Sequence, residues 1–311
     1  MEAPEKNTRP VLTRIFISAD ERRLRAGWRL GLHGFLVMCM LLLLGGLFSA
    51  GLSLLPNIKL TNTLLLIGSQ AITLVAFTVS VVIARRFLDQ RSFTSLGLGW
   101  NKHAFGDLSF GFLVPGLMMG LIYLIEWLAG WLTFQGFAWH FVSFSQIFID
   151  LGLMFVVFIV VSWQEELLSR GYWLQNLSEG LNQFWGALIS SVLFALLHLG
   201  NPHMSWYAGL GLFAAGMFMA YAYVRTRQLW LAFGLHAGWN FFEGPIFGFN
   251  VSGLEGLSAV IWQSVTGPES ITGGAFGPEA GLVLLPALLL GVVLILWYTK
   301  NRVQLSSDHG I

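Results

Sequence analysis

Three groups of polar residues interrupt apolar stretches in the second half of the sequence, and their side chains could do acid–base chemistry. The first group, Glu165-Glu166-x-x-x-Arg170, follows directly on the apolar run from Ile147 to Val161. A charged side chain in the middle of a bilayer costs about 2.5–3.5 kcal/mol on insertion scales. Charges kept at such a cost indicate a function, so we expect a membrane-embedded catalytic cavity around Glu165.

The two adjacent carboxylates of this group point in different directions on a helix. Glu166 and Arg170 lie one turn apart and can form an ion pair. Glu165 is rotated by about 100° from Glu166, so the same pair does not hold it and its carboxylate stays available. The structural alternative is a charge cluster that anchors a helix end at the membrane interface.

The other two groups are Phe194-x-x-x-His198 and His236-x-x-x-Asn240. A lone histidine on an apolar helix is more often a hydrogen-bonded core residue than a catalyst, and an interhelical hydrogen-bonding pair is common in membrane bundles. However, residues four apart lie on one face of a helix. His236 and Asn240 could therefore donate two hydrogen bonds to a single point.

The spacing along the chain predicts that these groups meet. Glu165 lies about as far before a turn near Gly180 as His198 lies after it. With a rise of about 1.5 Å per residue, the two residues share a depth on antiparallel neighbouring helices. His236 and Asn240, two turns into a later helix, can reach the same half of the bundle.

The residue types suggest activation of a water molecule. Burial disfavours the charged form of a carboxylate, which moves Glu165 toward the range of a general base. With His198 it could hold water and direct it at a carbonyl, while His236 and Asn240 face the developing oxyanion. The rival chemistry is a zinc site made by Glu165, His198 and His236. Metal-free chemistry is favoured because Asn240 is a poor zinc ligand but a good oxyanion donor.

The rest of the sequence supplies helices that position these residues. Of the 311 residues, 55% are hydrophobic and 11% are charged, whereas a soluble domain has roughly 25% charged residues. A spanning helix needs about 20 apolar residues. Eight apolar runs therefore predict eight transmembrane helices, near residues 28–52, 62–84, 108–134, 145–165, 184–199, 205–224, 229–247 and 282–298. The predicted fold is all-α: a polytopic membrane protein with an eight-helix bundle and a cytosol-facing cavity.

The Lys and Arg residues orient this bundle. Of the 17 Lys and Arg residues, all but Lys59 lie in or beside segments 1–27, 85–104, 164–183, 225–228 and 299–311. The Gly-rich segment 248–281 has no Lys or Arg but contains Glu255, Glu269 and Glu279. Since basic residues favour the cytosolic side, both termini are expected in the cytosol and segment 248–281 outside it.

The chain divides into five parts on this pattern. They are a cytosolic segment (1–27), three N-terminal transmembrane helices (28–144), a catalytic core of four helices (145–247), a Gly-rich extracytosolic connector (248–281), and the last helix with a cytosolic tail (282–311). Four other polar residues, at helix ends or in connectors, are interpreted as interfacial: Glu126, His140, Asp150 and Glu243.

The three groups, in this order and on successive apolar runs, resemble the signature motifs of the CAAX protease and bacteriocin-processing family of intramembrane endopeptidases. These are also called type II CAAX prenyl endopeptidase-like proteins. The resemblance covers about residues 145–247. It implies an eight-helix bundle whose cavity opens toward the cytosol, with Glu165 and His198 activating water and His236 and Asn240 as the oxyanion site. Glu166, Arg170 and Phe194 would support these residues structurally. The family has been described both as metalloproteases and as glutamate-dependent, metal-free enzymes.

The leading hypothesis is therefore hydrolysis of a peptide bond in a membrane-associated substrate. The expected partners are the lipid bilayer and a peptide or lipidated protein, such as the prenylated C-terminal peptide that the family name suggests; no nucleic acid is expected. One alternative is a non-catalytic membrane scaffold or self-immunity protein with the same fold. The other is an ion or proton transporter, which the lack of a long internal repeat disfavours.

Overall fold

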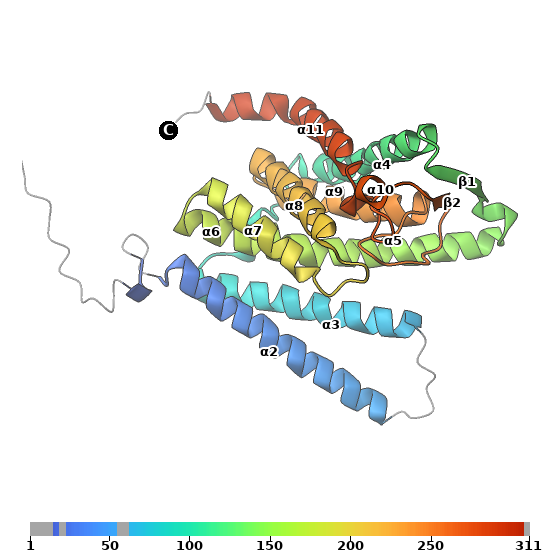
Figure 1. Ribbon diagram of the computed structural model, residues 1–311. Helices are drawn as coiled ribbons and strands as arrows, with labels where there is room; N and C mark the ends of the chain where they lie inside the picture. Colours follow the sequence, from blue (N-terminus) through green and yellow to red (C-terminus); the bar gives the residue numbers. More distant parts are fainter. Residues whose placement is uncertain (1–14, 19–22, 55–61, 308–311) are drawn as a thin grey trace, which may run out of the picture.

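The computed structural model describes residues 15–18, 23–54 and 62–307, and nearly all of their secondary structure is helical (Figure 1). The α-helices are α2 (Ala26–Ser53), α3 (Asn62–Ile83), α4 (Ala104–Leu128), α5 (Phe144–Glu166), α6 (Leu174–Gly180), α7 (Gln183–Leu197), α8 (Trp206–Thr226), α9 (Leu229–Phe241), α10 (Glu269–Thr272) and α11 (Leu284–Ser307). π-Helical turns cover Ala84–Leu88, Leu167–Trp173 and Phe242–Ile246, and 3-10 turns cover Phe93–Leu96, Ala138–His140 and Pro278–Ala280.

Long apolar helices make the chain an all-α polytopic membrane protein. Among the described residues, six helical stretches are long and apolar enough to cross a membrane: Ala26–Ser53, Leu64–Leu88, Ala104–Leu128, Phe144–Gly180, Trp206–Thr226 and Leu284–Arg302. The remaining two of the eight predicted apolar runs form α7 and α9, which have only 15 and 13 residues. Because such lengths fall short of the usual 20 residues, a complete crossing by each of them stays a prediction.

The prediction for the third apolar run, 108–134, was wrong at its C-terminal end. α4 ends at Leu128, and Gly130 follows with a positive φ of 74°. Glycine takes this left-handed conformation easily and commonly ends helices. The chain then forms strand β1 (Leu132–Phe137), which pairs antiparallel with β2 (Ile261–Val265). Segment 248–281 is therefore more structured than a simple connector.

The helix that carries Glu165 continues beyond it. α5, the π-helical turn Leu167–Trp173 and α6 form one continuous helical stretch, and π-helical insertions frequently occur at functional sites. The chain reverses after Gly180, as expected, and the Asn182 side chain accepts a hydrogen bond of 3.0 Å from the Trp185 backbone N–H at the start of α7. This cap fixes where α7 begins. It therefore also sets the position of His198, which directly follows the last residue of α7.

α9 lies in close backbone contact with α4. A Cβ atom at Gly234 would lie 2.4 Å from the Leu108 carbonyl oxygen, and one at Gly238 would lie 2.1 Å from that of Phe112. Only glycine permits this approach, which resembles the small-residue contacts of membrane helices. The contact fixes the rotation of α9, and therefore the direction in which its polar residues point.

A buried ionic network attaches α2 to the rest of the chain. Asp89, which is fully buried, pairs with Arg29 of α2 at 2.8 Å and with Arg85 at 2.7 Å. Arg29 also pairs with Glu179 of α6 at 2.9 Å. Figure 1 shows α2 beside α3 at this end and diverging from it at the other. The network thus holds the α6 end of the long helix against α2.

Candidate active site

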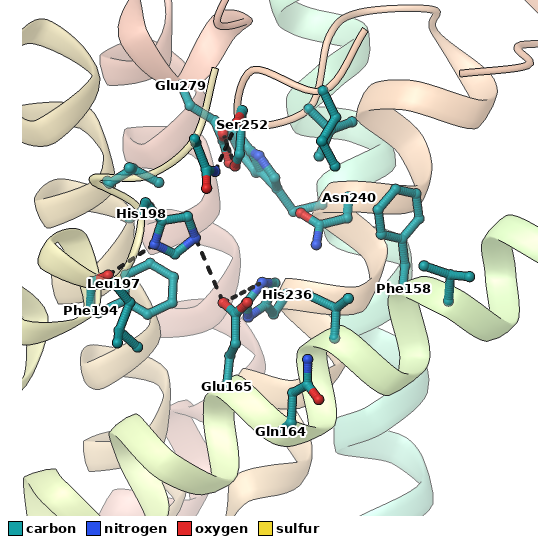
Figure 2. Close-up of a pocket in the computed structure, with 18 of the residues that line it drawn as sticks. Phe158, Gln164, Glu165, Phe194, Leu197, His198, His236, Asn240, Ser252 and Glu279 are labelled. Carbon is teal, nitrogen blue, oxygen red and sulfur yellow. Dashed lines mark hydrogen bonds and ion pairs between the residues drawn. The ribbon is translucent and has the colours of Figure 1, made fainter. Parts of the chain in front are cut away.

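Glu165, His198 and His236 converge on one point from three helices (Figure 2). The Glu165 Oε2 atom lies 3.8 Å from Nε2 of His198 and 3.8 Å from Nε2 of His236. This oxygen is buried and has no hydrogen-bond partner among the described residues. A gap of this size between polar atoms is one that a water molecule can bridge.

The orientation of His198 follows from a hydrogen bond to its own helix. Its Nδ1 atom lies 2.9 Å from the carbonyl oxygen of Phe194. A carbonyl oxygen can only accept, so Nδ1 carries a proton and donates. In the neutral ring, Nε2 then has a lone pair that faces Glu165. Phe194 therefore supports the site through its backbone as well as its ring.

Glu166 is held as the spacing predicted, and it has a second partner. Its Oε1 atom accepts a hydrogen bond of 2.9 Å from Arg170 and another of 2.9 Å from His236 Nδ1. Arg170 also donates to the carbonyl oxygen of Gly216 at 2.9 Å, and its guanidinium lies 4.5 Å from the centre of the Phe194 ring. Glu166 is 1% exposed and Glu165 is 18% exposed. Glu166 is thus buried and paired, while Glu165 faces open space.

That open space is a cavity of about 390 Å³. Glu165, His198, His236 and Asn240 all line it. The Asn240 side chain is almost fully buried and takes part in none of the hydrogen bonds of the described residues. Most of the remaining wall is apolar, from Leu66 and Phe77 of α3, Met154, Val157 and Phe158 of α5, and Leu212 and Phe218 of α8.

Sequence reasoning missed the contribution of segment 248–281 to this cavity. Ser252 and Glu279 line it, and the Ser252 hydroxyl donates a hydrogen bond of 2.5 Å to Glu279 Oε2. Burial raises the pKa of the Glu279 carboxyl, although the Ser252 hydrogen bond and the charges of His198 and His236 act in the opposite direction. The cavity was expected to open toward the cytosol, and segment 248–281 was expected to lie on the opposite side of the membrane. Since this segment lines the cavity, the two expectations conflict, and the side on which the cavity opens stays a prediction.

Two of the four residues interpreted as interfacial are inside the protein instead. Glu126 and Glu243 are fully buried, whereas His140 is exposed and Asp150 is partly exposed. Glu243 lies close to Glu279, since a Cβ atom at Gly277 would be 3.5 Å from Glu243 Oε1 and the charge of Glu279 acts on Glu243. For Glu243, position near a helix end did not indicate exposure, because segment 248–281 folds back over the end of α9.

The zinc alternative stays a prediction beside the metal-free chemistry. Glu165, His198 and His236 are suitable donor types for zinc. Within the ranges that the structure describes, however, no three His, Cys, Asp or Glu side chains are arranged to hold a metal ion. The proposal below follows the metal-free chemistry that Asn240 favours, and a chelator separates the two alternatives.

Comparison with known proteins agrees with the three motifs. Residues 146–242 match the family model described as "Type II CAAX prenyl endopeptidase Rce1-like". Two Bacillus subtilis (strain 168) proteins are similar: "Putative membrane peptidase YdiL" is 30% identical over 36% of this chain and 41% of its own length, and "Uncharacterized protein YyaK" is 28% identical over 52% and 54%. The chain thus spans about half the length of these relatives, and no solved structure matches it. The stretch that matches this family model, residues 146–242, contains all three motifs.

Proposed function

We propose that this protein is a membrane-embedded endopeptidase that hydrolyses a peptide bond with a water molecule activated by Glu165. One observation carries the proposal: the unpartnered Oε2 atom of Glu165 lies 3.8 Å from an imidazole nitrogen of His198 and of His236, inside a cavity. The family model at residues 146–242 and the relative described as a membrane peptidase support the same reaction class.

Water activation follows from the tautomer of His198. Because its Nδ1 atom donates to Phe194, its Nε2 atom is an acceptor, as is Glu165 Oε2. A water molecule between them donates one proton to each, so its lone pair is directed away from both. Glu165 then takes one proton as general base while the water oxygen attacks the substrate carbonyl carbon.

The oxyanion that forms needs hydrogen-bond donors, and the proposal gives this role to His236 and Asn240, which both line the cavity. His236 already donates to Glu166 through Nδ1. It can donate through Nε2 only if the ring carries a second proton, so the proposal assigns His236 as an imidazolium between the carboxylates of Glu165 and Glu166. The Asn240 amide supplies the second hydrogen bond. One such donor is commonly worth about 2.7–4 kcal/mol in the transition state.

The proton taken from water completes the reaction. Glu165 gives it to the nitrogen of the leaving amine as the C–N bond breaks, which leaves a carboxylic acid and an amine as products. The apolar wall of the cavity would bind the apolar part of the substrate, which we propose is a peptide or a lipidated protein reached from the bilayer. Prenylation of that substrate is suggested by the family description alone.

The test is cleavage of fluorescence-quenched peptides by the purified protein in lipid nanodiscs. Glu165→Gln and His198→Ala should each lower kcat/KM by at least about a hundredfold, since both act on the attacking water. Glu255→Gln is the matched control, because Glu255 is exposed and does not line the cavity. Wild-type cleavage rates in Glu165→Gln would refute the mechanism and would favour a scaffold that binds its partner without cleaving it.

A further inference from the structure

The cavity has a second acidic end, away from the proposed nucleophilic water. Figure 2 shows His198 and Asn240 between Glu165 and Glu279. The Glu279 residue is 4% exposed. It belongs to segment 248–281, which contributes Ser252 to the same wall. The proposed chemistry uses neither residue.

The backbone around Glu279 is fixed tightly enough to define a site. A Cβ atom at Gly211 of α8 would lie 1.7 Å from the Glu279 carbonyl oxygen, so only glycine lets this turn pack on the helix. Gly277 has a φ of 109°, and a Cβ there would lie 2.1 Å from the Asn250 carbonyl oxygen. The hydrogen bond from Ser252 then fixes the side chain. Glu279 therefore has a defined position in the cavity wall, in contrast to an acidic residue on a free loop.

No positively charged side chain of the described residues pairs with Glu279. No Lys or Arg side chain lines the cavity, and Glu279 has no ion pair with a described residue. The neighbouring Glu243 is fully buried and supplies no positive charge either. His198 and His236 act on Glu279 only through longer-range charge, and the charge of His236 is already matched by Glu166. A carboxylate enclosed in this way is stabilised by a positively charged ligand.

A second observation, independent of the carboxylates, indicates that a ligand occupies this space. The Asn240 side chain is 6% exposed, lines the cavity and makes no hydrogen bond with the described residues. Buried polar groups are normally satisfied, so the substrate whose carbonyl oxygen binds Asn240 is expected to continue along the cavity wall toward Glu279.

We propose that the Glu279 end of the cavity is a subsite for a cationic side chain, lysine or arginine, close to the scissile bond of the substrate. Glu279 is then a specificity-determining residue, and Ser252 orients its carboxylate. This inference rests on the proposed peptidase function and adds to it a class of substrate: a membrane-associated peptide that combines apolar residues for the α3 and α5 wall with one basic residue.

The experiment scans one lysine through each position of an apolar fluorescence-quenched peptide and compares each peptide with its norleucine twin. The wild-type protein in nanodiscs should prefer lysine at one or two adjacent positions. Glu279→Gln should lower the ratio of kcat/KM for the lysine peptide to that of its twin about tenfold or more, as expected for loss of a charge-assisted contact. Ser252→Ala should lower the ratio by a smaller factor, and this variant decides the matter if Glu279→Gln does not fold.

The control and the contrary outcomes separate this inference from the proposed function. Glu269→Gln changes an exposed carboxylate of the same segment that does not line the cavity, so it should keep the wild-type ratio. Cleavage without any preference for lysine, or an unchanged ratio in Glu279→Gln, would overturn the inference alone. If the wild-type protein cleaves no peptide, the proposed function fails and the inference fails with it.

Discussion

Glu165 and Glu166 are adjacent in the chain, yet replacing each with glutamine should damage the protein in a different way. Among the described residues, Glu166 is the only carboxylate paired with Arg170, which is fully buried. Removing one partner of a buried ion pair typically costs about 3–5 kcal/mol, because it leaves an uncompensated charge. Oε2 of Glu165 lies in the cavity wall and has no hydrogen-bond partner among the described residues. Glu165→Gln should therefore change the free energy of unfolding by about 0.5 kcal/mol or less.

The assay is thermal unfolding in detergent, followed by the fluorescence of the 13 tryptophans. At about 2 °C per kcal/mol for a chain of this size, Glu166→Gln should lower Tm by roughly 6–10 °C. Glu165→Gln should keep the wild-type Tm while losing peptide cleavage. A double variant, Glu166→Gln with Arg170→Met, removes both charges and should recover part of the loss. Equal Tm values for the two single variants would refute the assignment of Glu166 as the structural carboxylate.

Three further predictions follow from the packing, the donor geometry and the acidic end of the cavity. Gly238→Ala should prevent folding or lower Tm sharply, since its Cβ would lie 2.1 Å from a backbone oxygen of α4, whereas Gly152→Ala, with nothing within 4 Å, should match wild type in the same Tm measurement. A strong chelator should leave kcat/KM for a model peptide unchanged, and loss of activity that zinc restores would refute the metal-free steps. The raised pKa of Glu279 means that this carboxyl is protonated at low pH and ionised above its pKa. The preference for a lysine peptide should therefore increase as pH rises through that pKa in wild type and stay flat in Glu279→Gln. The pKa of Glu279 is higher in the folded state than in the unfolded state. Its contribution to the free energy of unfolding is therefore fully present below the unfolded-state pKa and is lost as pH rises through the folded-state pKa.

The sequence was sufficient for those features that follow from helical geometry alone. The pairing of Glu166 with Arg170 depends only on a spacing of four residues. The shared depth of Glu165 and His198 depends only on the rise per residue and on a reversal of the chain near Gly180. Both are present in the structure. Their catalytic roles stay predictions.

Other features depend on contacts between distant segments, and the sequence did not reveal them. The bond between His236 and Glu166 requires a particular rotation of α9, which is set by the contact of Gly234 and Gly238 with α4. The place of Glu279 requires segment 248–281 to fold over the cavity, and that segment has no hydrophobic period from which its path could be read. The early end of α4 is different, because Gly130 was a readable stop signal.

The proposed site contains two carboxylates and two cations, so its net charge is zero. This balance gives a reason for having both pairs of charges at the site. In the proposed mechanism, Glu165 and Glu166 are negative before reaction, and Arg170 and the His236 imidazolium are positive. When Glu165 accepts a proton from water, its negative charge is replaced by that of the oxyanion, and the total stays zero. His236 Nε2 faces Glu165 at 3.8 Å, so the same N–H can stabilise the negative charge before and after the transfer. Glu166 and Arg170 keep that N–H oriented. A donor that is already oriented needs no reorganisation at the moment of reaction. Negative charge therefore moves a short distance between groups that are already in place, which makes low-dielectric surroundings favourable for this hydrolysis.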